Sequence, residues 1–189
     1  MQVQGIPSLT YARPALATSA VQAGGAAPVL ARQPVMESQG SANLYLMSRL
    51  LGNDQDLHRL RMVGAGNPFM LRFATGGGFR RSITSFLTGI PADRLIVYGQ
   101  MADMMRIRNM SPDAAHLMVR SGIRSPGDLS RYSGSGFGQD IQRGVLFAAL
   151  TAKAFEIAAN EGRSYTPPSM QELALLSQAA IGLGSSISY

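Results

Sequence analysis

The chain has 189 residues, 46% of them hydrophobic, and a formal net charge of +6. A hydrophobic content of this size excludes a purely disordered chain and predicts one compact domain with extra segments. The chain contains no cysteine, which excludes disulfides, thiolate zinc sites and cysteine nucleophiles and favours a reducing cytoplasm.

The beginning of the chain, MQVQGIPSLTYARPALA, has no basic segment followed by an apolar one, so it does not predict a secretory signal. No uncharged apolar run reaches the length that spans a membrane. We therefore expect a soluble cytoplasmic protein without a membrane span.

Residues 1–40 are rich in Ala, Gly, Pro, Gln and Val and show no helical period. They predict an extended or disordered N-terminal arm without a core of its own. From Ser41 onward the pattern is helical, in short pieces separated by Gly and Pro, and no alternating strand pattern occurs. The expected division is an arm over 1–40 and an all-α domain over 41–189.

Arginine is concentrated in the middle of the chain. Twelve arginines face six aspartates between Ser41 and Tyr132, whereas the two flanking parts nearly balance. Such a segment indicates a polyanion or an acidic protein surface as the partner. A solvated basic face that reflects only the composition of the genome is the alternative, and the charge leaves both open.

The stretch 51–73 is predicted to form the first of two related helical units, because it matches 109–131 without a gap at a shift of 58 positions. Gly64 and Gly122 match as residues that end a helix. A repeated unit predicts two copies, related by an approximate twofold, that share a core; a chance similarity is the alternative. The other matched pairs include Asn67-Pro68 with Ser125-Pro126 and Leu71 with Leu129.

Two glycine-rich stretches lie near the first unit, GAGNP at 64–68 and ATGGGFRRS at 74–82. Neither ends in Gly-Lys-Ser/Thr or follows a predicted strand, so neither is predicted to bind a nucleotide. We interpret both as flexible loops between helices. Arg80 and Arg81, beside three consecutive glycines, make the second stretch a candidate for a mobile basic contact loop.

The second unit has well-marked helix boundaries. Ser111 is placed to cap a helix with Pro112 at its first position, and Gly122 supplies the left-handed residue that ends it. Ser125 and Pro126 repeat the cap and the proline, so a second short helix follows across a tight turn.

Two further helices are expected near the end of the chain. The segment GVLFAALTAKAFEIAANEG has apolar residues at helical intervals and ends at Gly162. Pro167-Pro168 blocks continuation, and Ser169 with Glu172 forms a capping box for the last helix. We interpret the apolar stripe of these helices as core, with an exposed protein-docking face as the alternative.

Four segments carry a family resemblance: FLTGIPADRLIVYGQMADMMRI, NMSPDAAHLMVRSGIRSPGDL, FAALTAKAFEIAANEG and YTPPSMQELALLSQAAIGL. Their order and spacing resemble the helix-hairpin-helix superfamily, and more closely a tandem bacterial version classed as a domain of unknown function. The resemblance covers roughly residues 41–183. It implies an all-α fold of tandem helix-hairpin-helix units with two C-terminal helices, preceded here by the extended N-terminal arm.

In DNA-binding members of that superfamily the hairpin is typically Gly-hydrophobic-Gly, whose backbone amides approach a phosphate. The matching positions here read Leu51-Gly52-Asn53 and Asn109-Met110-Ser111, so both copies lack the glycine pair. Ser111 still begins a helix, and arginines lie near it in sequence. The residues expected to contact an anion or nucleic acid are Arg80, Arg81, Arg106, Arg108, Ser111, Arg120 and Arg124.

The sequence offers no catalytic or metal-binding constellation. His58 and His116 occupy matched positions of the repeat, but no His or Cys cluster completes a ligand set, so we expect both to have packing roles. The aspartates are explained as helix caps and surface pairs. We expect no catalytic residue, no metal, no cofactor and no enzymatic activity.

We therefore expect a non-enzymatic adaptor or structural subunit of a larger protein assembly, which docks on a protein partner through its helical domain and its N-terminal arm. The arm is expected to be ordered chiefly by another chain, since it has no periodic face. The alternative is a sequence-independent DNA-binding protein that uses helix-hairpin-helix units and an arginine-rich surface, with weak, salt-sensitive binding.

Overall fold

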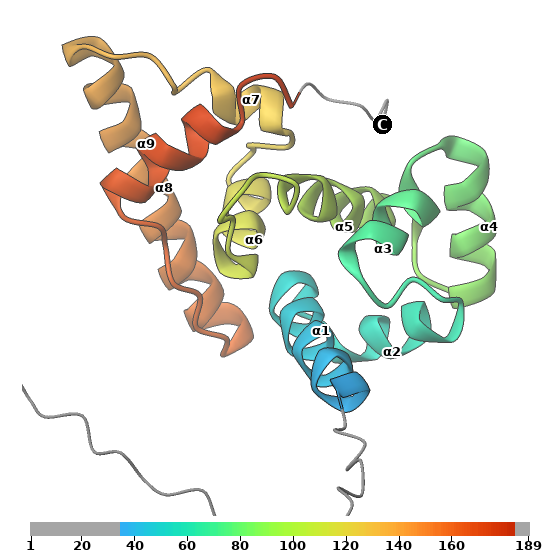
Figure 1. The fold of residues 1–189 in the computed structure, drawn as a ribbon. Coiled ribbons are helices and arrows are strands. Elements are labelled where there is room, and N and C mark those ends of the chain that lie inside the picture. Colours follow the sequence, from blue (N-terminus) through green and yellow to red (C-terminus); the bar gives the residue numbers. More distant parts are fainter. Residues whose placement is uncertain (1–34, 184–189) are drawn as a thin grey trace, which may run out of the picture. The chain divides into compact units, whose positions relative to one another are not determined.

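The computed structural model describes residues 35–183 of the chain. These residues form helices joined by short connections, with no strand among them, which confirms the all-α fold (Figure 1). The predicted arm up to residue 34 lies outside the described residues, so its expected role stays a prediction. The helices are α1 Val35–Leu51, α2 Asp54–Met62, α3 Pro68–Thr75, α4 Gly78–Thr88, α5 Ala92–Met104, α6 Pro112–Arg120, α7 Pro126–Ser130, α8 Phe137–Glu161 and α9 Met170–Ala179.

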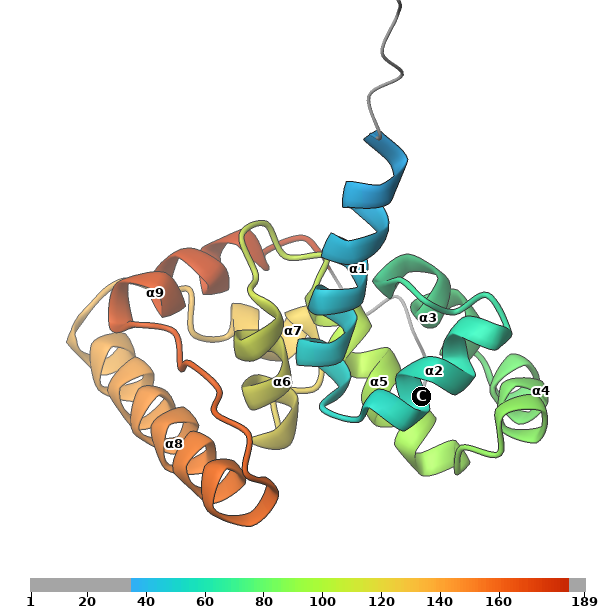
Figure 2. The same ribbon diagram turned by 90° about the horizontal axis from the view of Figure 1, so that it is seen from below.

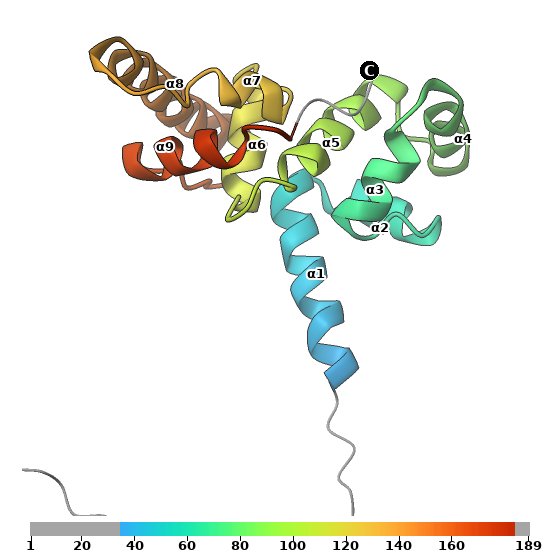
Figure 3. The same cartoon turned by 45° about the horizontal axis from the view of Figure 1, so that its top comes forward.

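The first helix begins earlier than the sequence predicts. Residues 35–40, expected in the arm, form the first turns of α1, and Figure 3 shows this end of α1 extending beyond the other helices. The C-terminal half of α1 is anchored in the core by Met47 and Leu50, which are fully buried. Extending an anchored helix adds one hydrogen bond per residue, so Gly40, at a cost of about 1 kcal/mol relative to Ala, does not stop it.

The helix α5 occupies the centre of the helical unit. It packs against α1, α3, α4 and α6 (Figures 1 and 3). Leu95, Met101 and Met104 of α5 are buried, and burying one such side chain contributes about 1.5–3 kcal/mol. The other helices add fully buried residues to the same core, among them Leu60, Leu71, Leu117, Met118 and Leu129.

The two predicted units end their first helices in the same way. Gly64 has a φ of 81° and Gly122 a φ of 94°, and each lies just beyond a helix C-terminus. The N–H of the following residue then donates to a carbonyl five positions earlier, at 2.8 Å in the first unit and 2.9 Å in the second. Asn67 caps α3 as Ser125 caps α7. The predicted glycine stops and caps are confirmed, whereas the twofold relation and the tandem helix-hairpin-helix arrangement remain predictions.

The stretch 74–82 is not a loop, so that prediction is wrong. Only Gly76 and Gly77 connect α3 to α4, which begins at Gly78. The Arg81 N–H donates to the Gly77 carbonyl at 2.9 Å and closes the first turn. Arg80 and Arg81 therefore lie on a helix rather than on a mobile basic loop.

The two C-terminal helices are confirmed, and α8 is longer than predicted because it begins at Phe137. Gly162, with a φ of 66°, ends it. The capping box of α9 forms as expected: the Ser169 N–H donates to Glu172 Oε2 at 2.7 Å, and the Glu172 N–H donates to Ser169 Oγ at 3.3 Å.

Buried carboxylates link the helices of the core. Asp103, fully buried on α5, lies 2.9 Å from Arg72 Nε and 3.1 Å from Arg106 Nη1. Asp56, also buried, accepts the Tyr98 hydroxyl at 2.7 Å. Burial, together with this hydrogen bond, raises the pKa of Tyr98. A buried carboxylate is energetically costly unless it is paired or hydrogen-bonded. These contacts therefore favour the one arrangement of the helices in which both carboxylates keep their partners.

Candidate protein-docking surface

The seven residues that the sequence proposes as contacts are spread over several helices and connections. Arg80 and Arg81 lie on α4, whereas Ser111 caps α6 and Arg120 ends it. A helix of nine residues is about 13 Å long, so Ser111 and Arg120 lie at opposite ends of α6. The structure does not gather the seven residues into one basic patch. The remaining three of the seven residues lie in the connections that flank α6: Arg106 and Arg108 before it, and Arg124 after it.

Some of these side chains already have partners within the protein. Arg106 pairs with buried Asp103, and Arg120 Nη2 lies 2.6 Å from Glu161 Oε1. The Ser111 hydroxyl accepts the backbone N–H of Ala114 at 3.1 Å. By contrast Arg108 and Arg124 are exposed, and neither forms an ion pair with another described residue.

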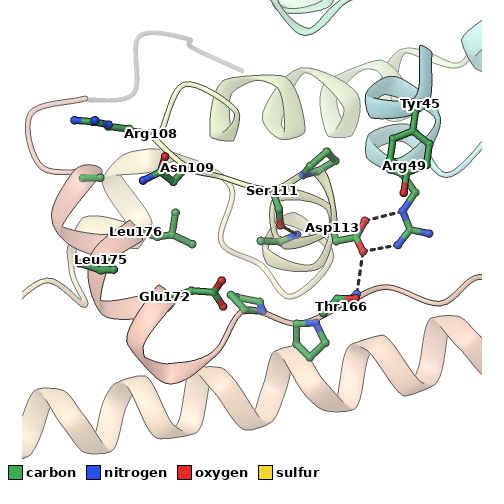
Figure 4. A pocket seen from close by; sticks show the side chains of 15 residues that line it. Tyr45, Arg49, Arg108, Asn109, Ser111, Asp113, Thr166, Glu172, Leu175 and Leu176 are labelled. Atoms are coloured by element: carbon green, nitrogen blue, oxygen red, sulfur yellow. Dashed lines mark hydrogen bonds and ion pairs between the residues drawn. The ribbon is translucent and has the colours of Figure 1, made fainter. Parts of the chain in front are cut away.

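A cavity of about 740 Å³ opens beside the N-terminus of α6 (Figure 4). Its walls come from α1, from the residues around the start of α6, from 166–168 and from α9. Of the predicted contact residues, Arg108 and Ser111 line it. Leu175 and Leu176 contribute to its apolar wall.

The polar groups of the cavity wall are engaged within the protein. The Arg49 guanidinium donates to the Asp113 carboxylate, with 2.8 Å between Nε and Oδ1, and the Thr166 N–H donates to the same carboxylate at 3.0 Å (Figure 4). The hydrogen bond to Asp113 raises the pKa of Arg49. Glu172 accepts the Ser169 N–H, which lowers the pKa of Glu172. These contacts join α1 and α6 to the start of α9, so we assign the wall a structural role.

The helix α4 packs on the protein through its polar face. Thr84 and Thr88 are its buried residues, and the Thr84 hydroxyl donates to the Ala74 carbonyl at 3.1 Å. Its large apolar side chains lie on the outside, where Phe79 is 80% and Phe86 87% exposed. A surface helix normally buries its apolar stripe against the core, so the packing of α4 is inverted.

An apolar groove of about 280 Å³ lies between α3 and α4. Phe73, Ile83 and Leu87 line it and remain exposed. The Arg80 guanidinium carbon lies 3.9 Å from the centre of the Phe73 ring, within cation–π distance. We call the exposed apolar residues in and beside this groove the α3–α4 face: Val63, Met70, Phe73, Phe79, Ile83, Phe86 and Leu87.

The segment that carries the α3–α4 face is basic. From Leu57 to Ala92 the chain has five arginines and no Asp or Glu. One of the five, Arg72, reaches buried Asp103, whereas Arg80 lines the groove itself. The face therefore combines large apolar side chains with the guanidinium of Arg80 as a positive rim, which suits an apolar partner surface that carries acidic residues.

The two histidines lie in different environments, so the expectation of matched packing roles is wrong. His58 is exposed. His116 is buried; its Nδ1–H donates to the Leu50 carbonyl at 2.8 Å, and its ring stacks on Tyr165 with the centroids 4.3 Å apart. Burial lowers the pKa of His116. The repeat is broken here because α1 packs over this face of α6.

Within the described part of the chain, no three His, Asp or Glu side chains come close enough to hold a metal ion. No helix between residues 35 and 183 is long and apolar enough to cross a membrane. Comparisons with protein-family models, curated proteins and solved structures find no match to this chain.

The sequence contains a signal for the α3–α4 face, although the three glycines at 76–78 favour a loop. Phe79, Ile83, Phe86 and Leu87 recur at i, i+4, i+7 and i+8, the spacing of an apolar helix stripe. This spacing predicts the helix and its stripe. It does not indicate whether the core or a partner covers the stripe.

Proposed function

We propose that the chain is a non-enzymatic adaptor or structural subunit of a larger assembly, and that it docks on a protein partner through the α3–α4 face. The inverted packing of α4, which leaves Phe79 and Phe86 almost fully exposed, is the observation that carries this proposal. A contiguous exposed apolar surface with a polar rim marks a protein interaction site. The arm, now limited to residues 1–34, is proposed to add to the docking.

The exposed aromatic side chains are the expected anchors of the interface. Burying one Phe or Leu side chain completely contributes about 1.5–3 kcal/mol. A few aromatic residues in well-packed positions carry most of the binding energy of an interface. Phe86, the most exposed large side chain of the face, is therefore expected to be the most sensitive position.

The charge of the rim specifies the kind of partner. An apolar segment flanked by Asp or Glu would fill the groove and face Arg80. The N-terminal residues 1–34 contain Arg13 and Arg32 and no acidic residue, so their charge does not complement this rim. The proposed occupant is an acidic amphipathic segment of another protein, a helix in a groove being a common recognition mode.

A photo-reactive phenylalanine analogue at position 86 of the full chain tests the proposal in cells. Its matched control is the same analogue at Phe69, which is 73% exposed but lines a separate hollow with Asn43 and Met105. We expect a protein crosslinked from position 86 and not from position 69. The purified partner should then bind F86S at least about tenfold more weakly, which corresponds to 1.4 kcal/mol, and should bind F69S normally. Equal effects at the two positions would refute docking at this face.

Sequence-independent DNA binding is the second candidate, because Arg108 and Arg124 are exposed and form no ion pair with any described residue. An electrophoretic shift with random duplex DNA at low and physiological salt separates the two functions. If the chain is an adaptor, we expect little DNA binding at about 150 mM salt, where the ions strongly screen the attraction between arginines and phosphates. If DNA binds, R108A and R124A should each reduce the salt slope of log affinity by about 0.9, and F86S should leave it unchanged.

A further inference from the structure

The long helix α8 has a second apolar face that the helical unit leaves exposed. One side of α8 belongs to the core, where Leu146, Leu150 and Ile157 are buried and the helix packs on α6 and α9. On the other side Phe137 is 82% and Phe155 74% exposed. A helix that is apolar on two opposite sides is normally covered on both.

The exposed residues have the spacing of a helix–helix seam. They follow one another at steps of four, four, three, four, three and four residues, and the 3-4 alternation is that of positions a and d in a coiled coil. With 25 residues the helix is about 37 Å long, and Figures 1 and 2 show it at the edge of the helical unit opposite α4. We call these residues the α8 seam: Phe137, Ile141, Val145, Ala148, Ala152, Phe155 and Ala159.

The α8 seam is uncharged, and four of the five charged residues of α8 pair with one another, while Glu161 pairs with Arg120 of α6. Asp140 Oδ1 lies 2.5 Å from Arg143 Nη2, and Glu156 Oε2 lies 2.5 Å from Lys153 Nζ. A neutral apolar surface complements another neutral apolar surface better than an acidic or a basic one. This distinguishes the seam from the α3–α4 face, whose arginines would repel a second copy.

The order of large and small side chains along the α8 seam lets it pack on an antiparallel copy of itself. A twofold axis through Ala148 places two such helices antiparallel and makes the contact isologous. Alanines near the centre let the two backbones approach closely, and one of the bulky residues meets an alanine. The opposed pairs are Phe137 with Ala159, Ile141 with Phe155 and Ala148 with its own copy, and Val145 comes within one residue of Ala152.

We infer that the α8 seam binds the α8 seam of a second copy of this chain in the antiparallel orientation. A strip about 37 Å long and about 10 Å wide buries roughly 370 Å² per copy. This is less than half of the about 800 Å² per partner in a standard interface. The dimer is therefore weak and forms at high local concentration.

The absence of cysteine from the chain permits a direct test by disulfide trapping in the full-length protein. A disulfide requires Cα atoms within about 7 Å, so A148C should form a covalent dimer. A149C is the control, since Ala149 is also exposed but lies 100° around the helix. A mixture of I141C and F155C should form the mixed dimer, and neither variant alone should do so. Dimers of I141C alone would refute the antiparallel orientation.

Sedimentation equilibrium from micromolar to millimolar chain concentration measures the association without any crosslink. V145E places a charge in the seam and should weaken dimerisation at least about tenfold, whereas A149E should not. Val145 is 66% exposed, so circular dichroism should show an unchanged fold. A monomer at every concentration, with no excess of A148C over A149C dimers, would overturn the inference. Another protein and residues 1–34 of the same chain would then remain as candidates to cover the seam.

Discussion

Replacing Asp103 with alanine is expected to destabilise the protein more than any surface charge does. Asp103 is fully buried, and the arginines beside it, Arg72 and Arg106, have side chains only 27% and 29% exposed. Removing the carboxylate leaves two partly desolvated cations without this partner. Breaking a buried pair in this way costs about 3–5 kcal/mol. In a domain of this size each kcal/mol lowers Tm by about 2–4 °C, which gives a drop of roughly 6–20 °C.

Urea unfolding followed by circular dichroism measures the free energy of unfolding of D103A, and a thermal scan measures its Tm. The matched control is D140A, because Asp140 is 65% exposed and pairs with Arg143 three residues away on α8. That variant should lose less than about 1 kcal/mol. A loss below about 1 kcal/mol for D103A, or equal losses for the two variants, would refute the reasoning. R106A should also lose stability whether or not any nucleic acid binds.

Three further outcomes follow from local structure. Burial lowers the pKa of His116 below its ordinary value of 6.5, so the unfolded chain takes up this proton at a higher pH than the folded chain does. Above about pH 6.5 the free energy of unfolding should not depend on this group. As the pH is lowered below 6.5, the free energy of unfolding should decrease by at most about 1.4 kcal/mol per pH unit. H116Q should flatten this part of the stability curve measured by urea unfolding, and H58Q should not. Gly64→Ala and Gly122→Ala should each lower the free energy of unfolding by about 1–2 kcal/mol in the same assay, because both residues have a left-handed backbone. No steric clash adds to this cost, since the space around an added Cβ is open at both positions. Ser169→Ala should cost about 1 kcal/mol by removing the cap of α9, and an unchanged Tm would contradict that role.

Helix boundaries are predictable from this sequence wherever they depend on local chemistry. Ser111, Ser169 and Gly162 act through hydrogen bonds to residues three or four positions away, so the pattern alone identifies them. The start of α4 lacks such a signal, since Gly77 makes no side-chain capping bond. The three glycines at 76–78 therefore favour a loop where the structure begins a helix, although the apolar spacing that follows them indicates the helix itself.

The exposure of the α3–α4 face is not a local property. Burying the polar side of α4 is tolerated because its threonine hydroxyls have acceptors: Thr84 donates to the Ala74 carbonyl, and Thr88 donates to the Thr84 carbonyl at 2.6 Å. The neighbouring helices determine which side of an amphipathic helix meets the core. For α4 these neighbours include α3 and α5. The same dependence separates His116, covered by α1, from exposed His58.

The two exposed apolar faces differ in charge, which is why a different partner is proposed for each. The α3–α4 face lies in a segment of five arginines without an acid, so two copies would repel each other there, while the α8 seam is neutral and matches its own reverse. Since α4 and α8 lie at opposite edges of the helical unit (Figures 1 and 2), a dimer through α8 leaves both α3–α4 faces open. If both proposals hold, such a dimer would bind a multivalent acidic partner with higher avidity than one face alone. A weak seam is sufficient for this purpose, because a partner that holds two copies close together raises their local concentration.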